Sequence, residues 1–407
     1  MERLASAGVS RHEAGKMDLQ DEVSVLKWQN SGIHPHMRRN RQKHSDNRRN
    51  DMRVEEIVSH FALPGAVRSV CPFGNGHIND TYLIDVDCGP GYLLQRVNTS
   101  VFRRPEEVQD NICRITAYLK ERICEEDGDP LRETLTPVLT HEKTSYVMDE
   151  SGYLWRTYLF VRDTRSCEQP VSAEELYEAG RVFGIFERRL KDFPAETLYE
   201  TIPGFHDTPA RAQQLREAMK KDAAHRGKSA LDEYRFCAER MHKADLFVKA
   251  YGEGLIPKRV THNDTKANNA LLDAESGRGI CVCDLDTVMP GFAAYDFGDA
   301  IRYGASLAQE DEPDLNKIAL SLEKAKAYAE GFLSEAGSVF SDTERKMLPD
   351  GIWMITYEQA MRFLADYLNG DVYYKTDYPE HNLVRARNQI ALVREIESCR
   401  TSLAALV

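Results

Sequence analysis

The chain has 407 residues, a formal net charge of -12, and 42% hydrophobic and 29% charged residues. This composition is that of an ordinary globular protein, and the length allows two lobes with a cleft between them. The acidic balance argues against a nucleic-acid-binding surface, and no apolar run approaches the roughly 18 residues of a membrane span. Since no signal-peptide pattern opens the chain either, these features predict a cytoplasmic protein.

The nine cysteines support the same compartment. Their number is odd, and they form no C-x-x-C framework, which favours a reducing environment. Cys281 and Cys283 lie two residues apart in an apolar run, so we interpret them as small core residues rather than metal ligands.

Residues 1–51 differ from the rest of the chain. The segment 34–50, HPHMRRNRQKHSDNRRN, has six Arg or Lys residues against one Asp and almost nothing apolar to bury. This pattern predicts a disordered basic extension. The alternative is a basic arm that binds an anionic partner.

Residues 52–165 are predicted to form an N-terminal nucleotide-binding lobe. Strands are expected near 67–70, 81–86 and 92–97 because apolar residues alternate there. The connection before the second strand contains Gly74, Asn75 and Gly76. Two glycines allow the backbone to approach phosphates closely, which makes these three residues candidates for cofactor binding. A plain hairpin turn would have the same pattern.

The third expected strand supplies two candidates for a residue that pairs with nucleotide phosphates. Gln95 and Arg96 are adjacent in YLLQRV and so point to opposite faces. Arg96 is the chemically natural choice, and an exposed strand residue is the alternative. In the helix expected near 105–120, Glu107 and Asn111 are both candidates for orienting the cation. We assign the pairing position to Asn111, where an acid is usual.

The order of the later elements predicts an α+β fold. Further strands are expected at 136–139, 145–148 and 153–161. Beyond them Ser172 and Glu175 form a capping box that should begin a helix, and Ser341 and Glu344 form a second one. With further helices near 315–335 and 380–405, residues 166–407 are predicted to be a helical C-terminal lobe that carries the catalytic and substrate sites.

The most informative stretch runs from Thr261 to Asp299. His262, Asp264 and Asn269 fit the pattern H-x-D-x-x-x-x-N. Two apolar runs, 270–272 and 280–285, follow as a predicted hairpin, and Asp284 lies in the second run. In phosphoryl transfer, this arrangement gives one carboxylate to the attacking hydroxyl and one amide and one carboxylate to magnesium.

Each polar residue in this stretch has a predicted role. Asp264 is the candidate catalytic residue, which would orient or deprotonate the hydroxyl. Asn269 and Asp284 offer oxygen ligands for Mg²⁺, and Asp286 is a candidate for a second metal contact or for holding Asp284. His262 is predicted to brace the loop.

These residues identify the chain as similar to the aminoglycoside phosphotransferase and choline kinase-like superfamily. The loop H-G-D-x-x-x-x-N appears here with Asn263 in place of Gly. Within that superfamily, separate segments resemble the N-acetylhexosamine 1-kinases, and the likeness covers about residues 53–407. The segments are GNGHINDTYLI at 74–84, LLQRVN at 93–98, THNDTKANN at 261–269, CDLDTVMPG at 283–291, YDFGDAIR at 295–302 and RFLADYLNGDVYYK at 362–375.

The resemblance implies a protein-kinase-like two-lobed fold, ATP and Mg²⁺ as cofactors, and phosphorylation of the anomeric hydroxyl of N-acetylglucosamine or N-acetylgalactosamine. The expected partners are thus ATP and a small sugar, with neither nucleic acid nor membrane, and the residues indicate no oligomeric state. Candidates for the sugar site are His206, Asp207, Tyr295, Arg302, Arg362, Asp366 and Tyr367.

Alternatives to this function remain at this point. Arg362 and Asp366 are four residues apart on one expected helix, so they could simply pair with each other. An amino alcohol or an aminoglycoside could replace the sugar as acceptor. An inactive nucleotide-binding pseudokinase is the alternative of another class.

Overall fold

The computed structural model describes residues 54–74, 78–167 and 171–407. The chain divides into a unit of residues 1–51 and a second unit, Met52–Val407, and everything described below belongs to the second. The predicted basic extension and the loop residues Asn75 and Gly76 lie outside the described ranges. No helix within these ranges is long and apolar enough to cross a membrane.

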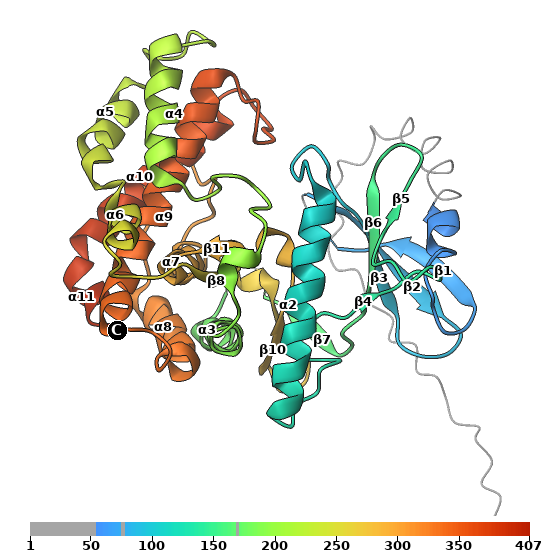
Figure 1. Cartoon of the computed structure of the whole chain (residues 1–407). Coiled ribbons are helices and arrows are strands. Elements are labelled where there is room, and N and C mark those ends of the chain that lie inside the picture. The colour runs from blue at the N-terminus through green and yellow to red at the C-terminus, as the bar shows by residue number, and fades with distance from the viewer. Residues whose placement is uncertain (1–53, 75–77, 168–170) are drawn as a thin grey trace, which may run out of the picture. The chain divides into compact units, whose positions relative to one another are not determined.

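An antiparallel sheet forms the N-terminal part of this unit (Figure 1). Its strands are in the order β1-β2-β3-β6-β4, and β5 pairs with β6 outside this path. Short connections between consecutive strands favour antiparallel pairing. The strands are β1 Val67–Pro72, β2 Asp80–Val86, β3 Tyr92–Arg96, β4 Pro137–Val138, β5 Val147–Met148 and β6 Leu154–Leu159.

One face of this sheet is closed by an apolar cluster. Val54 and Val58, from a helical segment before the sheet, pack with Ile84, Leu94 and Trp155. All five are at most 3% exposed, and burying such side chains contributes about 1.5–3 kcal/mol each. Because neighbouring side chains on a strand alternate, the residues next to Leu94 and Trp155 must face the other side of the sheet.

Helix α2, Pro105–Glu125, lies between the sheet and the C-terminal helices (Figure 1). Ile112 and Ile115 are fully buried and belong to the same apolar cluster as residues of the C-terminal part. The helix continues past the predicted end near Lys120 because Ile123 is also fully buried.

The C-terminal part is mainly helical, and α9 is its longest helix. α7 crosses α9 so closely that a Cβ on Gly298 would lie 2.4 Å from the Gly351 carbonyl oxygen. Only glycine permits this backbone approach. The helices are α3 Ala173–Arg189, α4 Thr208–Lys221, α5 Leu231–Arg240, α6 Leu246–Gly252, α7 Ala293–Gly304, α8 Leu322–Ala336, α9 Asp342–Asn369, α10 His381–Ser398 and α11 Arg400–Ala404.

Both predicted capping boxes are confirmed. Ser172 caps α3 and exchanges hydrogen bonds with Glu175, and Ser341 caps α9 and exchanges them with Glu344. Two other helices differ from their predicted bounds. The helix expected from 315 begins at α8, since a 3₁₀ turn precedes it, and the one expected over 380–405 is interrupted between α10 and α11.

Two small sheets position the polar residues of the central stretch. β9, Ala270–Asp273, pairs with β10, Gly279–Val282, and on its other side with β7, Thr164–Ser166. β8, Arg259–Thr261, pairs with β11, Met289–Gly291. The predicted hairpin is confirmed, although its second strand is shorter than expected. The α+β organisation, a strand-rich part followed by a helical part, is confirmed as well.

Candidate active site

The loop that follows β8 is fastened to α7 by Asp296. The Asp296 carboxylate accepts hydrogen bonds from the backbone N–H groups of His262 (2.6 Å) and Asn263 (2.7 Å). Thr265 Oγ1 donates to the Asp296 carbonyl oxygen at 2.6 Å. Burial raises the pKa of Asp296 to about 7, and the two N–H donors act against this rise. Three hydrogen bonds to one residue leave this loop little freedom.

Asn263 takes the position where the resemblance leads one to expect Gly. Its φ of +62° lies in the left-handed region, which Asn tolerates better than most residues. The side-chain amide donates to the carbonyl oxygens of Thr261 (3.2 Å) and Thr287 (2.9 Å). Asn263 therefore makes the same turn and also ties the loop to the segment after Asp284.

His262 is buried within the loop. Its Nε2 lies 2.8 Å from the Cys283 carbonyl oxygen, and its ring meets Phe183 and Phe186 edge-on. Burial lowers the pKa of His262, so the imidazole is neutral and donates from Nε2. These contacts join the loop to the end of β10, as a brace would.

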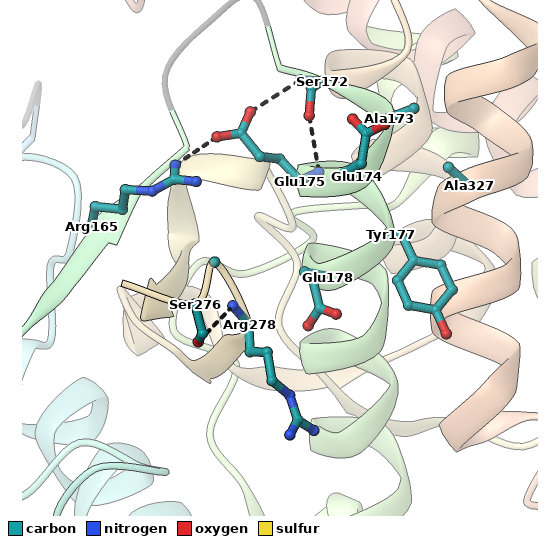
Figure 2. A pocket seen from close by; sticks show the side chains of 11 residues that line it. Arg165, Ser172, Ala173, Glu174, Glu175, Tyr177, Glu178, Ser276, Arg278 and Ala327 are labelled. Atoms are coloured by element: carbon teal, nitrogen blue, oxygen red, sulfur yellow. Dashed lines mark hydrogen bonds and ion pairs between the residues drawn. The ribbon is translucent and has the colours of Figure 1, made fainter. Parts of the chain in front are cut away.

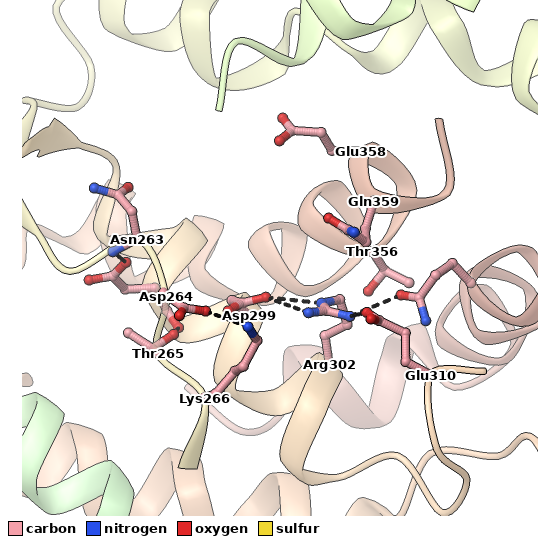
Figure 3. Close-up of polar contacts among 12 residues, drawn as sticks. Asn263, Asp264, Thr265, Lys266, Asp299, Arg302, Glu310, Thr356, Glu358 and Gln359 are labelled. Atoms are coloured by element: carbon pink, nitrogen blue, oxygen red, sulfur yellow. Dashed lines mark hydrogen bonds and ion pairs between the residues drawn. The ribbon is translucent and has the colours of Figure 1, made fainter. Parts of the chain in front are cut away.

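Asp264 is paired with a lysine of its own loop (Figure 3). Lys266 Nζ lies 2.9 Å from Asp264 Oδ1, and Asn269 Nδ2 donates to Asp264 Oδ2 at 3.2 Å. Burial acts to raise the pKa of Asp264, but the charge and hydrogen bond of Lys266 outweigh it and hold the pKa below its usual value. The Asp264 carboxylate is thus ionised and can accept a proton or a hydroxyl hydrogen bond.

Asp284 follows β10 in the left-handed conformation, with φ +58°. Its surroundings and the neighbouring carboxylates of Asp286 and Asp264 raise its pKa to about 7. Asp284 is nevertheless exposed on one side. An exposed carboxylate beside two others favours a cation at this point.

Asp286, in contrast, has both carboxylate oxygens occupied. Oδ1 lies 2.5 Å from Arg156 Nη2, and Oδ2 accepts from Asn79 Nδ2 at 2.7 Å. This placement agrees with a role in holding the loop of Asp284, whereas a second metal contact would compete with both hydrogen bonds.

Asn269 and Asp284 fit a small, hard divalent cation. The Asn269 amide nitrogen turns to Asp264, so the amide oxygen points elsewhere and is available as a ligand. In the described ranges no group of three or more His, Cys, Asp or Glu residues is arranged to hold a metal ion. Mg²⁺ needs no such cage, because it keeps several waters and binds substrate phosphates beside one or two protein oxygens.

The two strand residues proposed to pair with nucleotide phosphates, Gln95 and Arg96, lie on opposite faces of the N-terminal sheet. Gly74, after β1, has φ +74°, and no described residue lies within 4 Å of where a Cβ would be. Gln95 Oε1 accepts from Arg156, so Gln95 faces the segment of Asp284 and Asp286. Arg96 faces the other way, where it pairs with Asp80 and lies over the Trp155 ring.

Asn111 does not orient a cation. Its amide donates to the carbonyl oxygens of Tyr199 (2.8 Å) and Val288 (3.0 Å) and accepts from Tyr199 N–H. The expectation that it replaces the usual acid is therefore wrong. Asn111 instead fixes α2 to backbone of the C-terminal part, which an amide does well because it both donates and accepts.

Three of the expected substrate residues, His206, Asp207 and Tyr295, line one cavity of about 400 Å³ together with Asn263. His206 Nδ1 lies 2.8 Å from Glu358, and Asp207 caps α4 by accepting from Ala210 N–H. Tyr295 is 2% exposed and contacts Thr208 through its hydroxyl at 3.3 Å. Much of their hydrogen-bonding capacity is therefore used within the protein.

Two of the expected substrate residues farther along the chain, Arg302 and Tyr367, are buried in contacts within the protein. Arg302 is buried between Asp299 (2.9 Å) and Glu310 (2.7 Å), as Figure 3 shows. Tyr367 is 3% exposed and lies under the Arg226 guanidinium. These two residues hold the helices together and leave little surface for a ligand.

Arg362 and Asp366 do not pair with each other, although they are one turn apart on α9. Asp366 accepts backbone N–H donors of residues 372–374 at 2.9–3.0 Å. Arg362 lies 5.1–5.9 Å from the rings of Phe205, Tyr373 and Tyr374, and donates to Gln359 at 3.2 Å. The alternative that these two residues simply pair with each other is therefore ruled out, because Asp366 is already occupied by the loop after α9.

A larger hollow, of about 760 Å³, lies elsewhere (Figure 2). It is lined by the first turns of α3 and by the β9–β10 turn. Of its charged side chains, Glu175 accepts a hydrogen bond from the Ser172 N–H and lies 2.6 Å from Arg165. None of the predicted site residues lines it.

Comparison with models of protein families shows which family has this arrangement of residues in its sequence. The model of the phosphotransferase enzyme family (APH) matches residues 69–331, which include Gly74, Asp264, Asn269 and Asp284. The chain belongs to this phosphotransferase family. The membership confirms the superfamily that the sequence motifs indicated.

Solved structures are similar to this phosphotransferase in fold. A microcompartment-associated aminopropanol kinase has 16% identity and a TM-score of 0.55, with 88% of this chain and 99% of that chain covered. An amicoumacin kinase has 14% identity, a TM-score of 0.53 and coverages of 88% and 96%. A spectinomycin phosphotransferase has 14% identity and a TM-score of 0.53, with 86% of this chain and 98% of that chain covered. This likeness confirms the predicted kinase-like fold.

Sequence reasoning missed two charged residues that contact the candidate site residues Asp264 and Asp286. Lys266 lies two residues after Asp264, so attention to charges within the motif could have found it. Arg156 lies on β6, more than 100 residues before Asp286, and only the pairing of β3 with β6 brings it to the site. No spacing rule in the sequence reports that contact.

Proposed function

We propose that this chain is a small-molecule kinase that uses ATP and Mg²⁺ to phosphorylate the anomeric hydroxyl of an N-acetylhexosamine. In this reaction the anomeric oxygen forms a bond to the γ-phosphorus, the bond to the β–γ bridging oxygen breaks, and ADP leaves. The hydroxyl proton goes to Asp264 or through it to solvent. Family membership supports the phosphotransfer half of the proposal.

The residues near Asp264 supply what phosphoryl transfer needs from a protein: position and charge. The ionised Asp264 orients the acceptor hydroxyl. Asn269 and Asp284 would hold Mg²⁺, which when bound neutralises charge on the nucleotide phosphates. Lys266, 2.9 Å from Asp264, places a second positive charge next to the hydroxyl that is phosphorylated.

The observation that carries the acceptor assignment is Arg362. Within the described ranges its guanidinium forms no ion pair with an Asp or Glu within 4.0 Å; it lies over the rings of Phe205, Tyr373 and Tyr374 and donates to Gln359. A guanidinium donor beside aromatic faces suits a neutral ligand that offers oxygen acceptors and a flat apolar side, as an N-acetylated sugar does.

The acidic groups around it argue against a cationic acceptor. Glu358 contacts His206 and Thr208, Glu310 pairs with Arg302, and Asp366 binds the loop after α9. None of these three carboxylates is therefore free to balance an ammonium group placed beside Arg362. The aminopropanol kinase takes an amine by its name, and this balance of charges favours a different acceptor for the present chain.

The test is a substrate panel with the purified full-length protein, ATP and Mg²⁺. N-acetylhexosamines, plain hexoses, aminopropanol, ethanolamine and an aminoglycoside are compared by ADP release, and ³¹P NMR identifies the phosphorylated position. We expect turnover with an N-acetylhexosamine and a sugar 1-phosphate as product. Turnover with the amines alone would overturn the acceptor assignment and leave the kinase assignment standing. ATP binding without turnover on any acceptor would favour the pseudokinase.

A further inference from the structure

The sheet face that meets the segment of Asp284 and Asp286 carries an unusual pair. Gln95 on β3 and Arg156 on β6 are direct cross-strand partners. Their neighbours Leu94 and Trp155 belong to the apolar cluster on the opposite face. The position on β3 where a kinase-like site would present a cation to phosphates is therefore held by a neutral amide.

Arg156 supplies a charge at this place from the neighbouring strand. Its Nε and Nη2 donate to Gln95 Oε1 at 3.1 and 2.9 Å, and Nη2 lies 2.5 Å from Asp286 Oδ1. Gln95 thus holds the guanidinium by one edge, and Asp286 holds it at one end. Asn79, just before β2, meets the other Asp286 oxygen. The guanidinium consequently lies where the start of β2, β3 and the Asp284 segment come together.

One nitrogen of the Arg156 guanidinium donates no hydrogen bond to any described residue. Arg156 is 1% exposed, and its Nη1 is buried without a hydrogen-bond acceptor in the described parts of the chain. A buried N–H group without an acceptor costs about 1–3 kcal/mol, and native proteins rarely leave a charged one in that state. The orphan donor therefore points to an acceptor that comes from outside the protein.

We infer that Arg156 is the phosphate-binding cation of this kinase and that it takes, from β6, the place of a lysine on β3. A guanidinium paired with a carboxylate at one end can still donate to phosphate oxygens from its other nitrogen. Asp286 then replaces the helix acid that usually orients such a cation, which agrees with the use of Asn111 for backbone contacts alone. The inference rests on ATP use in the proposed function and is independent of the acceptor.

The test compares two variants that differ only at Arg156: Asp286→Asn and the double variant Arg156→Gln, Asp286→Asn. Either single removal leaves one buried charge unpaired, Asp286 in Arg156→Gln or Arg156 in Asp286→Asn. Asp286→Asn is the reference because it keeps the cation under test, and the double variant removes both charges. Dissociation constants are measured by calorimetry for ADP with excess Mg²⁺ and for adenosine, which has no phosphate. Thermal melting of each variant verifies that it is folded.

We expect the double variant to bind ADP on the order of 10- to 100-fold more weakly than Asp286→Asn does, with equal affinity for adenosine. Arg156→Lys keeps a cation opposite Asp286, so it should bind ADP more tightly than the double variant. Equal ADP affinity with and without a positive charge at position 156 would overturn the inference. An equal loss for ADP and adenosine would do so as well, because it would show a purely structural role. Since no sugar takes part, failure here is separate from failure of the acceptor assignment.

Discussion

Lys266 Nζ lies 2.9 Å from Asp264 Oδ1, so the residue proposed to orient the acceptor hydroxyl is paired with a cation from its own loop. Lys266 is also near Asp299 and Glu310, whose charges help to raise its pKa above the usual value. The pair places a negative and a positive charge side by side where a hydroxyl is to meet a phosphoryl group. Two substitutions separate the contributions of these charges.

Asp264→Asn should lower kcat on the order of 10²- to 10⁴-fold, since the amide cannot accept the hydroxyl proton. Dissociation of ADP should change little, because the nucleotide is proposed to be held by other residues. Steady-state kinetics with the acceptor found in the panel, and calorimetry with ADP, measure the two effects. Unchanged turnover would remove Asp264 from the mechanism.

Lys266→Met should lower kcat roughly 10- to 100-fold, as expected for loss of a charge-assisted contact to the transferred group. The KM of the acceptor should stay within a few-fold, because the charge is needed in the transition state rather than for binding. Lys326→Met is a matched control on the exposed surface of α8 and should have wild-type kinetics. A rise in acceptor KM with kcat unchanged would assign Lys266 to ground-state binding instead.

Arg362→Met should raise the KM of the acceptor at least about 10-fold and leave the KM of ATP unchanged. The reason is that a half-buried donor of the proposed sugar site is lost while the nucleotide contacts stay. Arg394 is an exposed arginine that lies over Phe236, so Arg394→Met controls for loss of an arginine–aromatic contact elsewhere. Equal KM values for Arg362→Met and the wild type would show that the acceptor binds away from α9.

Asp366→Asn should also raise the KM of the acceptor, although Asp366 itself is not expected to touch the acceptor. The carboxylate accepts from the N–H groups of residues 372–374, and an amide nitrogen in one of its positions would face those donors. The loop carrying Tyr373 and Tyr374 should then shift away from Arg362, with a loss of about 1–3 kcal/mol in the free energy of unfolding.

Asp377→Asn changes a side chain of the same loop that is 91% exposed, and it should alter neither quantity. Denaturant titration and acceptor kinetics are measured on both variants. A loss of stability for Asp366→Asn without any change in acceptor KM would show that the loop takes no part in binding.

Local patterns in the sequence predicted the parts of this molecule that depend on near neighbours. The capping boxes at Ser172 and Ser341, the β9–β10 hairpin and the spacing of Asp264 and Asn269 all involve residues a few positions apart. Helical or strand geometry then determines which atoms meet. The resemblance to the phosphotransferase family was predicted from several such short segments taken together.

Contacts between distant segments could not be predicted in this way. Arg362 and Asp366 have the spacing of an ion pair, yet Asp366 binds a loop whose path depends on how α9 ends and α10 begins. Arg156 reaches Asp286 only because β6 lies next to β3. Tertiary packing decides such cases, because one carboxylate has several possible donors and the chain's path selects among them.

Glu187 on α3 offers a test of stability that does not involve the reaction. It is 3% exposed, and its Oε1 is buried without a hydrogen-bond partner in the described ranges. Burial, together with the nearby charge of Asp296, raises its pKa well above the usual value. The folded protein therefore favours protonated Glu187. Its contribution to stability is complete at acidic pH, below the unfolded pKa near 4.5, and is lost as the pH rises through the folded pKa.

Glu187→Gln, which stays neutral at every pH, should thus raise the free energy of unfolding at pH 8 on the order of 1 kcal/mol and change it less at pH 5. Denaturant titrations at the two pH values measure this difference. Glu174→Gln alters an exposed acid in the first turn of the same helix, where the negative charge favours the helix N-terminus, so it should be slightly destabilising at both pH values. An equal effect of Glu187→Gln at pH 5 and pH 8 would show that Glu187 is ionised in the folded protein, with its charge balanced by Arg259.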